Sequence, residues 1–161
     1  MTRSHPLFTS CGRSPWEVDK ATTQARLLSG RYRLEAVSGH WTPWNREGLC
    51  VLPDCWATDH SHKGTVENFL LSCPSLSPTR QYLENYRQYF FQAKPHLFQL
   101  VQECLDTDPV QFWLDASTMA PVISATQSEG DVILEDIFRL TRTYCQRLHK
   151  TRCEMLEDMW D

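Results

Sequence analysis

The sequence predicts an all-α fold, a small irregular helical domain interrupted by one loop that carries cysteines. Apolar residues recur at intervals of three and four toward both ends of the chain, which is the period of one helix face. Proline, glycine and the closest pair of cysteines fall between residues 40 and 63, where regular structure is not expected. No alternating strand pattern longer than a few residues is present in the sequence. These observations together favour helices packed around an irregular loop.

The clearest predicted helix is the last one. Its apolar residues fall within a stripe roughly 80° wide at 100° per residue. The residues of the stripe are Ile133, Ile137, Leu140, Tyr144, Leu148 and Met155. The polar residues predicted to lie on the opposite side are Arg139, Arg142, His149 and Lys150. The pattern is typical of a helix with one buried face and one solvated face.

The first predicted helix extends from Glu17 to about Val37, because Ala21, Ala25, Leu28 and Tyr32 recur at helical spacing. Residues 1–15 lack periodicity and are expected to be a disordered leader. Residues 16–161 are then one helical domain that contains a knuckle-like segment, residues 50–74.

Capping residues and prolines place the shorter helices. Thr65 is expected to cap a helix that continues through Leu71 and stops at Pro74. Ser77-Pro78 and Asp108-Pro109 each combine a capping residue with a proline at the first helical position. The remaining helices are expected near 78–93, 95–105, 109–116 and 121–128.

Composition limits the function classes. No stretch approaches the roughly 20 apolar residues of a membrane span, and no apolar signal core follows Met1. We therefore expect a soluble, intracellular protein. The net charge of −4 argues against a globally basic nucleic-acid binder, but five basic residues between Arg139 and Arg152 form a local basic run.

The cysteines point to a metal site rather than to disulfides. There are seven of them, an odd number, with no secretory signal. Cys50 and Cys55 lie on a proline-bearing turn, and Cys73 follows eighteen residues later at a helix end. Tetrahedral zinc needs four ligands, and a turn pair plus a helix-borne pair is one way to supply them. Three of the four are visible in the sequence, and the fourth is not obvious. The alternative is that these cysteines are ordinary small apolar residues.

Several stretches resemble the region that follows the polymerase in animal non-long-terminal-repeat retrotransposons. The resemblance covers the chain from about His5 to Arg152. It is carried by Gln24-Ala25-Arg26-Leu27-Leu28-Ser29-Gly30-Arg31-Tyr32-Arg33, His40-Trp41, the cysteine pair, Glu67-Asn68-Phe69-Leu70-Leu71-Ser72-Cys73-Pro74, Phe112-Trp113-Leu114-Asp115-Ala116-Ser117, Pro121-Val122-Ile123-Ser124-Ala125-Thr126-Gln127 and Phe138-Arg139-Leu140-Thr141-Arg142-Thr143-Tyr144-Cys145.

The resemblance implies a zinc knuckle of three cysteines and one histidine. The family's histidine position is occupied here by Asn68, and asparagine is a poor zinc ligand. The expected zinc ligands are therefore Cys50, Cys55 and Cys73, with His60 or His62 as the fourth. A water molecule in the fourth position, or a site that no longer binds metal, stays open.

The resemblance also implies the function. The chain is expected to be a non-catalytic fragment from behind the polymerase, because it lacks the Tyr-x-Asp-Asp setting for catalytic magnesium. RNA or DNA is the expected partner, without a membrane or a small-molecule substrate. The expected phosphate-binding residues are Arg26, Arg31, Arg33, Arg139, Arg142 and Lys150, and Trp41, Trp44 and Trp56 could stack on bases. The alternative is a helical protein-interaction module with no nucleic-acid role.

Overall fold

A computed structural model describes residues 14–38, 43–58, 62–121, 123 and 130–160. The all-α prediction is confirmed: these residues form helices and turns, with one isolated bridge between Leu49 and Lys63 and no strand. The α-helices are α2 (Pro15–Leu28), α3 (Glu35–Ser38), α4 (Pro53–Thr58), α5 (Ser77–Phe90), α6 (Pro95–Thr107), α7 (Pro109–Leu114) and α9 (Gly130–Trp160). Shorter turns are η2 (Pro43–Asn45), the π-helical η3 (Asn68–Ser72), η4 (Pro74–Leu76) and η5 (Ala116–Met119).

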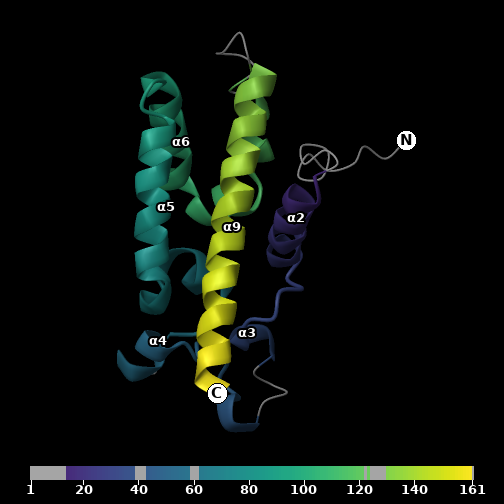
Figure 1. The fold of residues 1–161 in the computed structure, drawn as a ribbon, viewed down its shortest axis with the longest axis vertical. Coiled ribbons are helices and arrows are strands. Elements are labelled where there is room, and N and C mark those ends of the chain that lie inside the picture. Colours follow the sequence, from purple (N-terminus) through teal and green to yellow (C-terminus); the bar gives the residue numbers. More distant parts are fainter. Residues whose placement is uncertain (1–13, 39–42, 59–61, 122, 124–129, 161) are drawn as a thin grey trace, which may run out of the picture.

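Helix α9 is the spine of the molecule. It runs along the long axis between α2 on one side and α5 on the other, while α3 and α4 lie toward its C-terminal end (Figure 1). It also packs against α7, η3, η4 and η5. At 31 residues and about 1.5 Å per residue, α9 is long enough to reach every other part of the fold.

The predicted apolar stripe of α9 forms the centre of the core. Its members from Ile133 to Leu148 are all buried, and Met155 is half-buried. Trp113 of α7 stacks on Tyr144 with ring centroids 3.7 Å apart and an interplanar angle of 8°. This contact joins the α6–α7 pair to the spine.

A second face of α9 is covered by α2. Gln24 is buried there and donates hydrogen bonds to the Trp113 carbonyl at 2.7 Å and to the Thr141 hydroxyl at 3.1 Å. Arg142 is 1% exposed and pairs with Glu17 at 3.0 Å. The spine is therefore buried on two sides, and its α2 side uses polar contacts.

The helices differ from the predictions in three places. Helix α4 forms between residues 40 and 63, where regular structure was not expected. The first helix ends at Leu28 rather than near Val37, because the chain turns at Gly30 with φ of +70°, and α3 follows as a separate turn. Ser77 lies inside α5, where Leu76 is the capping residue and Ser77 makes no capping hydrogen bond.

Two predicted caps are confirmed. The Asp108 carboxylate accepts from the Gln111 amide at 3.0 Å, and the Thr65 hydroxyl accepts from the Asn68 amide at 3.1 Å. The helix predicted near 121–128 and the leader at 1–15 lie almost entirely outside the described residues.

Candidate metal centre

The first two cysteines are presented by a tight turn and a short helix. The Cys50 amide donates to the His62 carbonyl at 2.8 Å, next to the Leu49–Lys63 bridge. Gly48, two residues earlier, lets the same turn lie against α3: its φ is +68°, and a Cβ there would lie 2.7 Å from the Ala36 Cα. The chain then enters α4, which carries Cys55 in its first turn.

The third cysteine lies at the exit of the π-helical turn η3. Its amide donates to the Asn68 carbonyl at 2.7 Å, and the Arg80 side chain of α5 donates to its carbonyl. The Tyr144 hydroxyl of α9 donates to the Leu70 carbonyl at 2.6 Å. Cys73 is therefore positioned by contacts with both α5 and α9.

The three thiols converge in a buried cluster. Their exposed fractions are 5% for Cys50, 1% for Cys55 and 0% for Cys73. The Sγ of Cys73 lies 3.9 Å from that of Cys50 and 3.3 Å from that of Cys55, and all three sulfur atoms are within 4.8 Å of one another. Tetrahedral zinc with bonds of about 2.3 Å places its sulfur ligands roughly 3.8 Å apart. The cluster fits three corners of such a site.

Cys73 carries the most acidic thiol of the three. The hydrogen bond from Cys50 is the main cause that lowers the pKa of Cys73 to about 6; burial opposes it, while Cys55 and the amides of Ser75 and Leu76 add to it. The bond to Cys73 and burial raise the pKa of Cys50. Burial and the bond to Cys73 raise the pKa of Cys55 to about 11. The lowered pKa of Cys73 favours its thiolate, the form that binds a metal, while Cys50 and Cys55 would release their protons when a cation binds.

The fourth corner is where this chain departs from the pattern that it resembles. Asn68 is 6% exposed, and its side chain makes a hydrogen bond to Cys55. Burial and Cys73 raise the pKa of Cys55, and the hydrogen bond from Asn68 lowers it by a smaller amount. Within the described part of the chain, the cluster of candidate ligand atoms contains the three cysteines and does not include His62. His62 is half-buried, and its carbonyl accepts from Cys50. His60 lies outside the described residues.

The candidate phosphate-binding residues divide into two groups. The side chains that are exposed are Arg26, Arg31, Arg33, Arg139 and Lys150. Arg142 does not share their surface, because its guanidinium is buried against Glu17. The prediction that it lies on the solvated side of the last helix is therefore corrected: α2 covers that part of α9.

Two aromatic residues near the cysteines are open to solvent. Trp44 is 61% exposed and Trp56 is 38% exposed, whereas Trp41 lies outside the described residues. Exposed tryptophan rings can stack on a ligand.

Sequence reasoning missed the groups that position and surround the site. Arg80 and Tyr144 anchor the Cys73 turn from two different helices, and no local pattern links them to it. It also missed a row of aromatic residues on α5, Tyr82, Tyr86 and Phe90, whose spacing of four was a usable signal.

No family of known proteins, no curated protein and no solved structure matches this chain. None of the helices within the described ranges combines the length and apolar character of a membrane span.

Proposed function

We propose that this chain is a non-catalytic, zinc-stapled helical domain that holds nucleic acid, and that it derives from the region behind the polymerase of a non-long-terminal-repeat retrotransposon. The convergence of Cys50, Cys55 and Cys73 carries the proposal. The same three cysteines occupy ligand positions in the knuckle that the sequence resembles. Nothing in their spacing of five and eighteen residues requires them to meet.

Zinc would act as a structural staple. Cys55 lies in a helix of six residues, and Cys50 and Cys73 lie in turns, so these segments have few backbone hydrogen bonds of their own. Three metal–sulfur bonds would hold them together. Cys50, Cys55 and Cys73 would hold the metal. The fourth ligand would come from His60, His62 or water, and replacement of the histidine by Asn68 would weaken the site.

Elemental analysis of the purified chain tests the metal part. We expect one zinc per chain, lost in Cys55→Ser and retained in Cys104→Ser, whose half-buried thiol lies outside the cluster. Asn68→His should tighten zinc binding, because it restores the nitrogen ligand that the resemblance implies. Equal zinc content in Cys55→Ser and the natural chain would refute the cluster as the site.

The nucleic-acid part rests on exposed cations and rings. Arg31 and Arg33 follow α2 in the segment that leads to α3, and both are exposed. Trp44 and Trp56 are exposed beside the cysteine turn. Guanidinium groups bind phosphate oxygens in a bidentate manner, and tryptophan rings stack on unpaired bases.

Titration of labelled RNA and DNA against salt concentration tests this part. We expect affinity to fall linearly on a log–log plot as salt rises, because phosphate contacts release bound counterions. A double variant, Arg31→Gln with Arg33→Gln, should flatten that slope. Absence of binding at low salt would reject the nucleic-acid role and favour the protein-interaction module.

A further inference from the structure

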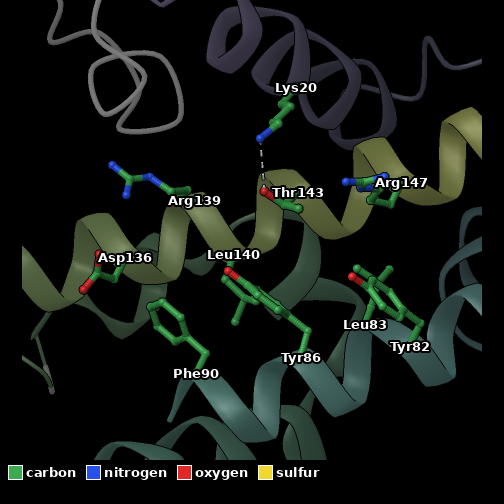
Figure 2. A pocket seen from close by; sticks show the side chains of 10 residues that line it. All are labelled: Lys20, Tyr82, Leu83, Tyr86, Phe90, Asp136, Arg139, Leu140, Thr143 and Arg147. Carbon is green, nitrogen blue, oxygen red and sulfur yellow. Dashed lines mark hydrogen bonds between the residues drawn. The ribbon is translucent and has the colours of Figure 1, made fainter.

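A second site lies away from the cysteine cluster, in a groove of about 260 Å³ between α5 and α9. Figure 2 shows aromatic side chains of α5 along one wall, basic side chains of α9 along the other, and Lys20 reaching in from α2. Its lining residues take no part in the candidate metal centre.

The aromatic wall is made by residues spaced four apart on α5. Tyr82, Tyr86 and Phe90 share one helix face, and the rings of Tyr86 and Phe90 lie 6.3 Å apart. Tyr82 is 65% exposed and Tyr86 is 44% exposed. Rings so open to solvent contribute little to the core, so their alignment along the groove leaves their faces available to a ligand.

The basic wall is made by α9 and α2. Arg139 and Arg147 are two helical turns apart, a rise of about 12 Å. Arg139 lies 3.8 Å from Glu135, but both side chains are more than half exposed, and such pairs bind weakly. Within the part of the chain that the structure describes, the Arg147 side chain makes no ion pair.

The side chains that line the groove carry a net positive charge. Lys20 is held in place by Glu17 at 3.0 Å and by the Thr143 hydroxyl at 3.4 Å. Asp136 is the one acidic residue among the lining side chains, against three cations. A ligand that carries negative charge therefore complements the groove.

We propose that this groove binds an unpaired nucleic-acid strand, with bases stacked on Tyr82 and Tyr86 and phosphates on Arg139 and Arg147. The inference rests on the proposed nucleic-acid function and names where the strand lies. A positive track beside a row of exposed rings is the arrangement that holds single strands without sequence preference. A duplex fits poorly, because the faces of its bases are covered by their neighbours and cannot stack on tyrosine.

The aromatic half is tested with Tyr86→Ala in the full zinc-loaded chain. Fluorescence anisotropy with a short unstructured RNA, and with DNA of the same sequence, should show a loss of affinity of about tenfold, the effect of removing one stacked base. Tyr89→Ala is the matched control, because Tyr89 is a 76% exposed tyrosine of α5 that does not line the groove. It should bind as the natural chain does.

The basic half is tested with Arg147→Gln. Loss of one phosphate contact to a single strand should reduce the slope of log affinity against log salt by about 0.7. Lys94→Gln removes the same charge outside the groove and should leave the slope unchanged. Tyr86→Ala should also leave it unchanged, which separates stacking from charge.

The outcomes separate the groove from the broader function. If the natural chain binds the strand and both groove variants bind equally well, the groove proposal is overturned and the nucleic-acid function stands. If the natural chain binds neither RNA nor DNA, both are overturned. Tighter binding of a duplex of the same sequence would also overturn the groove proposal. A preference for one of the two single strands that either groove variant abolishes supports it and identifies the sugar.

Discussion

The helical scaffold, formed by α2, α5, α7 and α9, and the cysteine segment, residues 43–58 and 62–76, are held together differently. The scaffold buries a continuous apolar stripe along α9 and adds hydrogen bonds between distant helices. The cysteine segment consists of turns and helices of three to six residues, one isolated bridge and three thiols. Stability is therefore spread over many contacts in the scaffold and concentrated at a few points in the cysteine segment.

The largest effect is expected in the scaffold core. Ile137→Ala should lower the free energy of unfolding by about 4 kcal/mol, because it removes a fully buried side chain and leaves a cavity. Urea denaturation measures it. Val132→Ala on the same helix is the control: Val132 is 57% exposed, and its loss should cost less than about 0.5 kcal/mol. Equal costs for the two variants would mean that α9 is not the spine.

The next effect is expected where α2 meets α9. Glu17→Gln should destabilise the fold by about 3 kcal/mol, because it leaves the buried Arg142 guanidinium without its carboxylate. Glu135→Gln, at the exposed pair with Arg139, should cost less than about 1 kcal/mol. Thermal or urea unfolding distinguishes them, and a similar small cost in both would contradict the buried pair.

Acid should erase the difference between Glu17→Gln and the natural chain. Burial acts to raise the pKa of Glu17, but the hydrogen bonds from Lys20 and Arg142 outweigh it, so the pKa is lowered. A carboxyl group with a lowered folded pKa stabilises the fold above its ordinary pKa, and this contribution is lost as pH falls through the folded value.

Metal removal should affect the cysteine segment more than the scaffold. Zinc at a free concentration 100 times its Kd should stabilise the natural chain by about 2.7 kcal/mol, and a chelator should remove that gain. Cys73→Ser should gain little from zinc, while Cys104→Ser should respond as the natural chain does. Amide exchange should rise mainly in residues 43–58 and 62–76. Uniform exchange over α2, α5 and α9 would mean that the two regions do not differ.

The smallest effect is expected at the junction of the two regions. The Tyr32 hydroxyl lies 2.6 Å from Nδ1 of His149, and burial, aided by Arg152 and Arg26, lowers the pKa of His149 although Asp19 opposes this.

As pH falls, His149 therefore binds a proton at a higher pH in the unfolded chain than in the folded chain. As pH falls below about 6.5, the ordinary pKa of histidine, the free energy of unfolding should decrease. The decrease should be at most about 1.4 kcal/mol per pH unit. His149→Gln should reduce this slope in urea titrations at stepped pH. An unchanged slope would show that His149 takes no part.

The sequence predicted the scaffold better than the cysteine segment, for a physical reason. One apolar stripe on α9 is visible as periodicity, and its members Ile133, Ile137, Leu140, Tyr144 and Leu148 are buried as expected. The second buried face, where Arg142 meets Glu17, is polar, so an amphipathic pattern assigns it to solvent. Helix α2 ends before Gly30, whose positive φ turns the chain, although the apolar spacing continues to Tyr32.

In the cysteine segment, the residue types indicated which side chains could bind a metal, but the sequence did not indicate which other residues contact them. Cys50, Cys55 and Cys73 could be chosen as a set from their chemistry and from the resemblance. The hydrogen bond between Asn68 and Cys55 could not be predicted, because it depends on a π-helical turn whose backbone is anchored by Tyr144, more than seventy residues away in the sequence.

The position of α9 at the C-terminal end of the chain has a consequence for synthesis. Arg142 reaches Glu17 across a sequence separation of 125 residues, and Arg152 reaches Glu35 across 117. Such distant contacts slow folding, because a long loop must close before they form. On the ribosome, α2 and the cysteine segment emerge first and cannot pack against α9 until it has been synthesised. During that interval their apolar surfaces are exposed to chaperones and to aggregation.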